Sequence, residues 1–126
     1  MNEMDFAGMA IGNHEYDWGS EFIANNEELA EFPLLAINVY DRKTNKLAEY
    51  CKSSVLVEGY GAEIGIIGAI GDCYSSIAVD KCDDVYFKVG AQLTELVKKE
   101  SEKLKKQGAD EFSTIRIKDI EFEIKE

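Results

Sequence analysis

The polar residues that could do chemistry gather in one short segment, residues 12–19, which reads Gly-Asn-His-Glu-Tyr-Asp-Trp-Gly. His14 is the only histidine in the chain, and an imidazole can donate a proton to a leaving group or hold an anionic oxygen. Asp17 follows three residues later and could accept a hydrogen bond from the other ring nitrogen, which would fix the tautomer. Asn13 offers an amide oxygen, a usable ligand for a divalent metal ion. On spacing alone, a surface turn with a helix-capping Asp17 is the alternative interpretation.

The elements on either side of this segment would position it as a ligand site. Residues 6–11 form a short apolar run that is typical of a buried strand. Ser20 predicts a helix N-cap, and the helix is expected to continue to about Phe32 because Pro33 follows it. Proteins of the α/β class place ligand sites where the carboxyl end of a strand meets a helix. Residues 12–19 would occupy that place.

The rest of the chain predicts a further alternation of strands and helices. Three apolar runs are typical of strands, residues 34–40, 51–58 and 62–70. The last two flank a Gly-Tyr-Gly hairpin signal, and the run at 62–70 is apolar on both faces, as a central strand would be. Residues 85–107 carry apolar side chains at helical spacing. In the tail, the alternation changes phase at Lys118-Asp119, which predicts either a bulge or a hairpin turn.

Charge and composition exclude several classes of partner. The formal net charge of −11 would repel phosphate backbones and anionic lipid, so neither nucleic acid nor a membrane is expected as a partner. Three cysteines without a C-x-x-C pair argue against a disulfide framework, although a single Cys73–Cys82 bridge stays an alternative. No run approaches ~18 apolar residues, and no secretory signal is present, so the chain as it stands fits the cytoplasm. Gly65, Gly68 and Gly71 match no phosphate-loop spacing, and close strand packing is the expected reason for them.

The order of these segments resembles the 5′-nucleotidase and 2′,3′-cyclic phosphodiesterase family of calcineurin-like metallophosphoesterases. The match begins with residues 5–19, which are similar to the Gly-Asn-His-Glu signature of that family, and three later segments follow in the same order, residues 32–39, 61–68 and 104–110. The resemblance implies an α/β fold, a partial metallophosphatase-type sandwich in which a mixed β-sheet is flanked by helices. We therefore expect one domain over residues 1–126, metallophosphoesterase-like over 1–110 and with an atypical β tail over 111–126.

The resemblance also implies roles for three residues. Asn13 would be a metal ligand, His14 would contact the phosphoryl group and stabilise the transition state, and Asp17 would pair with His14. The implied reaction is metal-dependent hydrolysis of nucleotide phosphate esters, with Mn, Zn or Mg as the divalent ion and a nucleotide or other phosphate ester as the substrate. The family is commonly exported, which leaves the compartment of this chain open.

The number of metal ligands argues against full activity of the isolated chain. Two metal ions need about seven to nine protein ligands, several of them histidines, whereas this chain has one histidine, already assigned to the phosphoryl contact. We therefore expect a truncated phosphoesterase that is weak or inactive alone, unless another chain supplies ligands. The alternative is a non-catalytic structural or oligomerisation domain that forms a homo-oligomer through its C-terminal strands, since unpaired strand edges attract partners.

Overall fold

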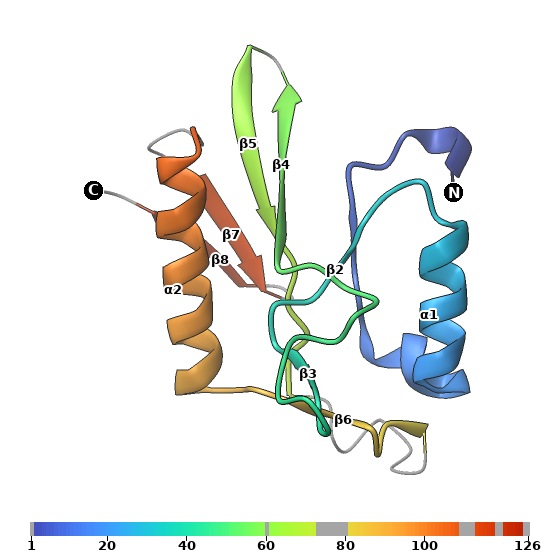
Figure 1. Cartoon of the computed structure of the whole chain (residues 1–126). Helices are drawn as coiled ribbons and strands as arrows, with labels where there is room; N and C mark the ends of the chain where they lie inside the picture. Colours follow the sequence, from blue (N-terminus) through green and yellow to red (C-terminus); the bar gives the residue numbers. More distant parts are fainter. Residues whose placement is uncertain (1, 60, 73–80, 109–112, 118–119, 125–126) are drawn as a thin grey trace.

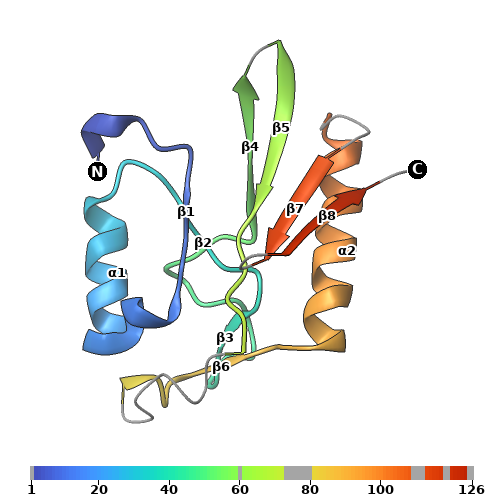
Figure 2. The same cartoon turned by 180° about the vertical axis from the view of Figure 1, so that it is seen from behind.

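The computed structural model describes residues 2–59, 61–72, 81–108, 113–117 and 120–124. Short strands lie in the middle of the molecule, with one α-helix on each side (Figure 1), and the same arrangement is seen from behind (Figure 2). In chain order the elements are η1 (Asn2–Met4), β1 (Met9–Ala10), η2 (Asn13–Trp18), α1 (Ser20–Leu29), β2 (Leu34–Leu35), β3 (Val39–Asp41), β4 (Ser54–Gly59), β5 (Ala62–Ile67), β6 (Val85–Phe87), α2 (Ala91–Lys106), β7 (Ser113–Ile117) and β8 (Ile120–Ile124).

The strands pair two by two. β1 and β2 are parallel, whereas β3–β6, β4–β5 and β7–β8 are antiparallel. This mixed α/β arrangement confirms the predicted fold class. It also resolves the alternatives for the tail, because β7 and β8 are the two arms of a hairpin, with Ile117 opposite Ile120.

The segment 34–39 runs through the core and is buried at every residue. It was predicted as one strand over 34–40, but it is divided between two pairings: β2 lies beside β1, and β3 lies beside β6. Asn38, which is fully buried, lies just before β3, where the chain passes from one strand pair to the other. Its side-chain amide bonds to the backbone of Ile70 and Lys88, so a polar residue joins three segments where the strand would have continued.

The helix predicted over residues 85–107 is wrong at its beginning. Residues 85–87 form strand β6, in which Val85 and Phe87 are buried and Tyr86 is half-buried, the alternation expected of a strand. Gly90, with φ of 60°, separates this strand from α2. The predicted end is confirmed, since α2 ends at Lys106 and Gly108 has φ of 117°.

The prediction of a central strand over residues 62–70 is also wrong. β5 forms the predicted hairpin with β4, and this hairpin projects beyond the other strands (Figure 1). One of its faces contacts α2, where Gly65 lies against Leu104, while Ile64 on the other face is 41% exposed. Apolar residues on both faces therefore do not indicate a strand buried on both sides here.

Two predicted lengths near the N-terminus are too long. The strand expected over residues 6–11 is reduced to the two residues of β1, and the helix expected to reach Phe32 ends at Leu29. Within the described ranges, neither α-helix has the length and apolarity that crossing a bilayer requires. Cys51 and Cys82 are buried, and Cys73 lies outside the described residues.

Candidate functional site

The segment predicted as a loop is the 3₁₀ helix η2, which is separated from β1 by Ile11 and Gly12. Its first turn is closed by Glu15, whose carboxylate accepts a hydrogen bond of 2.6 Å from the backbone N–H of Gly12. At the other end, Gly19 has φ of 90°, a conformation that favours glycine, and lets the chain turn into α1. Gly19, and not Ser20, is therefore the N-cap position of α1, and the Ser20 hydroxyl instead donates to Asp84 at 2.9 Å.

His14 and Asp17 lie together on the outer face of η2. A 3₁₀ helix has three residues per turn, so side chains at i and i+3 lie one above the other, and His14 Nδ1 is 3.1 Å from Asp17 Oδ2. The side chains are 80% and 52% exposed, respectively, so the pair adds little to stability. With Nδ1–H donating to the carboxylate, Nε2 of His14 is left for a ligand.

The inner face of η2 is held by Tyr16, which is fully buried. Its hydroxyl lies 2.8 Å from that of Tyr50, and its ring meets the ring of Phe87 edge-on at 5.5 Å. Asn13 lies one turn before Tyr16 and is half-buried. The sequence assigned no role to Glu15 or Tyr16, yet these two residues fix the conformation that brings His14 and Asp17 together.

The tyrosine pair should make the free energy of unfolding depend on pH in the alkaline range. Burial raises the pKa of Tyr16 far above its ordinary value, and Tyr50 raises it further. Burial also raises the pKa of Tyr50 to about 12, although hydrogen bonds with Tyr16 and Ser20 act in the opposite direction.

Because both folded-state pKa values are raised, the stabilisation is complete below the unfolded pKa of about 10 and is lost as the pH rises toward 12. We therefore expect the free energy of unfolding, measured by urea denaturation, to fall steadily over that interval. A Tyr16→Phe variant should show a shallower fall. An equally steep fall in the variant would contradict a role of Tyr16 in this pH dependence.

The described residues do not fit a two-metal centre by themselves. Among them, no three His, Cys, Asp or Glu side chains are grouped so that they could hold a metal ion. Asn13 contributes one amide oxygen next to His14, and an amide oxygen is a ligand for a hard or borderline divalent ion. This segment can therefore supply one ligand and one hydrogen-bonding imidazole, but not a complete coordination shell.

Comparison with known proteins gives the family. No protein-family model matches the chain. Protein UshA of Yersinia enterocolitica is 34% identical over 92 residues, which is 72% of this chain and 16% of that protein. Protein UshA of Escherichia coli is 31% identical over 107 residues, 84% of this chain and 19% of that protein. The 5′-nucleotidase of Vibrio cholerae is 34% identical over 68 residues, 54% of this chain and 12% of that protein.

Solved structures agree with these sequence relatives. The 5′-nucleotidase precursor of Thermus thermophilus superposes with a TM-score of 0.73 at 25% identity, covering 91% of this chain and 21% of that one. This chain belongs to the 5′-nucleotidase family of calcineurin-like phosphoesterases. The calcineurin-like phosphoesterase YfkN of Bacillus subtilis, with a TM-score of 0.71 at 23% identity over 91% of this chain and 35% of that one, shows the same fold.

Membership of the 5′-nucleotidase family confirms the resemblance seen in the sequence, and metallophosphoesterases as a class use divalent metal ions. The chain spans 16% and 19% of the length of the two UshA relatives. What those whole proteins do is therefore not automatically a property of this chain. The roles of Asn13, His14 and Asp17 stay predictions.

Proposed function

We propose that this chain carries the phosphoryl-contact part of a metal-dependent phosphoesterase centre that acts on nucleotide phosphate esters. The observation that carries the proposal is the His14–Asp17 pair, 3.1 Å apart and open to solvent, at the carboxyl end of β1. Relatives named 5′-nucleotidase support the substrate class. The site is shallow and exposed, so an anionic phosphoryl group could reach it without any rearrangement of the core.

Each residue would have a separate part in the chemistry. In its imidazolium form, His14 would donate from Nε2–H to a phosphoryl oxygen, stabilising the charge that develops there. Asp17 would act as a positioning residue by keeping the proton on Nδ1 and the ring in place. Asn13 would offer its amide oxygen to a divalent ion, and such ions, when bound, supply Lewis-acid polarisation and an activated water. The remaining ligands would come from polypeptide outside the described residues, so we expect weak or no turnover by this chain alone.

Removing the imidazole tests the assignment directly. Because the His14 side chain is 80% exposed, His14→Ala should change the free energy of unfolding by less than about 0.5 kcal/mol. If the chain hydrolyses AMP in the presence of Mn²⁺ or Zn²⁺, the same variant should lower kcat by roughly a hundredfold or more. A variant that unfolds would instead favour a purely structural role for His14.

A binding measurement decides the case in which no turnover is seen. His14 is the only histidine, so its imidazole gives one unambiguous set of proton resonances. Inorganic phosphate or AMP, titrated with Mg²⁺, should shift these resonances in a saturable way, and Asp17→Asn should weaken the effect. Resonances that do not move at millimolar phosphate would contradict the proposal.

A non-catalytic oligomerisation domain is the second candidate. It is favoured by the tail, because among the described strands β7 and β8 are hydrogen-bonded only to each other, and a strand edge without such a partner can pair with another chain. Light scattering on the full chain and on a chain ending at Asp110 separates the two cases. A dimer that requires the tail supports this candidate, whereas two equal monomers remove it.

A further inference from the structure

An apolar groove lies between α1 and the β1–β2 pair, and His14 and Glu15 border it at one end. Its volume is about 480 Å³. The apolar side chains that line it come from both sides and include Met9, Trp18, Phe22, Ile23, Leu29 and Leu34. A groove of this size can take several aliphatic side chains of a polypeptide.

The surface around this groove is unusually apolar for a protein with a charge of −11. Trp18 is 74% exposed, Phe22 is 47% exposed and Leu29 is 74% exposed. Met4 and Phe6, on the segment that leads into β1, are exposed as well. Among residues 2–59, 61–72 and 81–108, Ile64 is the one other large hydrophobic side chain that is exposed. A concentration of this kind marks a binding surface.

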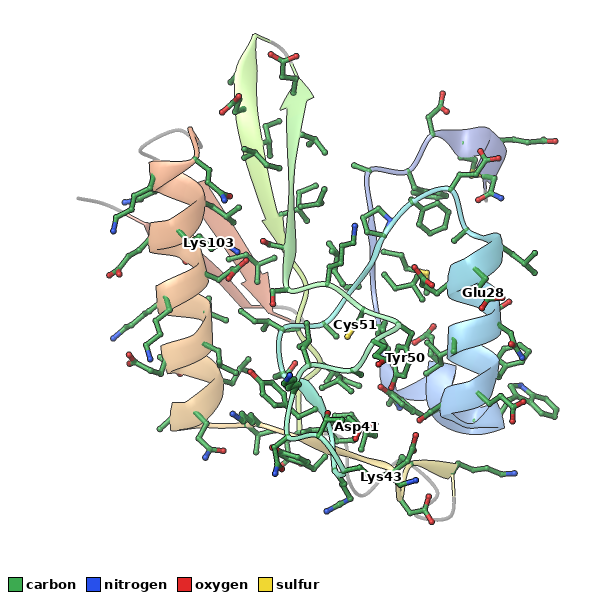
Figure 3. All side chains as sticks on the ribbon, in the orientation of Figure 1. Glu28, Asp41, Lys43, Tyr50, Cys51 and Lys103 are labelled. Carbon is green, nitrogen blue, oxygen red and sulfur yellow. The ribbon has the colours of Figure 1, made fainter. Side chains whose placement is uncertain are left out.

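The segment that supplies η1, β1, η2 and α1 carries charged side chains of one sign only. Residues 2–41 contain no Lys or Arg, and their carboxylates are Glu3, Asp5, Glu15, Asp17, Glu21, Glu27, Glu28, Glu31 and Asp41. The second face of α1 lines another groove, of about 460 Å³, whose charged lining residues are Glu21, Glu27, Glu28, Asp41, Glu49 and Asp84. Figure 3 shows Glu28 on α1, with Tyr50 and Asp41 on the segments that face this side of the helix. The helix α1 thus has an apolar groove along one face and an acidic groove along the other.

From this pairing of grooves we propose that the surface binds a polypeptide segment of another protein in which large apolar side chains are flanked by lysine or arginine. The apolar side chains would enter the groove beside Trp18 and Phe22, and the cationic ones would face the carboxylates of α1. A second copy of this chain would bring the same negative charge to the contact and be repelled, and an anionic lipid surface is disfavoured for the same reason. The inference goes beyond the phosphoesterase proposal and does not depend on it.

The test uses Trp18, the only tryptophan of the chain, as the reporter. The probe is a short synthetic peptide of leucine and lysine without aromatic residues. It should shift the emission of Trp18 to shorter wavelength in a saturable way, and the affinity should fall as the salt is raised from about 50 to about 300 mM. Two control peptides are used, one with glutamate in place of lysine and one with serine in place of leucine. Each should bind at least roughly tenfold more weakly.

Substitutions in the groove test where the peptide binds on the chain. Phe22→Ser and Leu29→Ser change exposed side chains and should keep the fold, as circular dichroism would show, while lowering the affinity for the leucine–lysine peptide by at least roughly tenfold when combined. Ile64→Ser, an exposed apolar residue on the β4–β5 hairpin, is the matched control and should leave the affinity unchanged. The proposal is overturned if the lysine–serine peptide binds as tightly as the leucine–lysine peptide. It is also overturned if the groove variants bind like the wild type.

Discussion

Replacing Gly68 by alanine is expected to lower the free energy of unfolding by about 3 kcal/mol. A Cβ at this position would lie 2.3 Å from Leu35 Cβ, 2.5 Å from the Leu35 carbonyl oxygen and 2.7 Å from its carbonyl carbon. These atoms belong to the backbone and the first side-chain carbon of β2, so no rotamer change can relieve the clash. The backbone is held on both sides, because the N–H of Ile11 donates to the carbonyl of Leu35 and the N–H of Lys52 donates to the carbonyl of Leu34.

The measurement is urea denaturation of the Gly68→Ala variant beside a Gly59→Ala variant. At Gly59 the nearest atom to an added Cβ is the tip of the Ile64 side chain, at 3.2 Å, and that side chain can move. Its cost should stay below about 1 kcal/mol. Equal losses in the two variants would show that the close approach of Gly68 to Leu35 does not limit the packing of the core.

Close packing at Gly68 is one of the features that the sequence could indicate, because a glycine inside an apolar strand commonly marks a place where another backbone approaches closely. The β4–β5 hairpin and the helix around Leu93 and Val97 were predictable for a similar reason. A turn signal and a 3.6-residue period are local, and both act before distant parts of the chain meet.

The predictions that were wrong concern elements whose structure depends on contacts between residues far apart in the sequence. Residues 85–87 are apolar enough for the first turn of a helix, but β6 exists because it pairs with β3, more than forty residues earlier. β5 was expected at the centre of a sheet, and its position in a projecting hairpin follows from its neighbours rather than from its own composition. No pattern inside either segment carries this information.

The candidate site also has one part that the sequence predicts and one part that it does not. The spacing of His14 and Asp17 was enough to predict their contact, since both lie in one short segment. The anchoring of that segment could not be predicted, because the hydroxyl of Tyr16 meets Tyr50 across thirty-four positions of sequence. A buried tyrosine among polar residues is a weak signal until its partner is known.

Replacing Asn38 by leucine is expected to cost about 3–5 kcal/mol of stability, the largest effect that we expect from a single side chain. Asn38 is fully buried, and its Nδ2 donates to the carbonyls of Ile70 and Lys88 at 2.7 and 2.9 Å. Its Oδ1 accepts from the N–H of Ile70 at 3.0 Å. Leucine would leave these three backbone groups without the partner that Asn38 gives them, and the two groups of Ile70 are buried away from water.

A comparison of two substitutions at this position separates hydrogen bonding from packing. Asn38→Asp keeps the shape of the side chain but loses the two donors, and it places a carboxylate beside two carbonyl oxygens. If hydrogen bonding dominates, its loss of stability by urea denaturation should equal or exceed that of Asn38→Leu. Asn25→Leu, on the exposed side of α1, is the matched control and should change stability by less than about 0.5 kcal/mol. An Asn38→Leu variant as stable as the wild type would mean that β3, the segment after β5 and the segment before α2 are held together by apolar contacts alone.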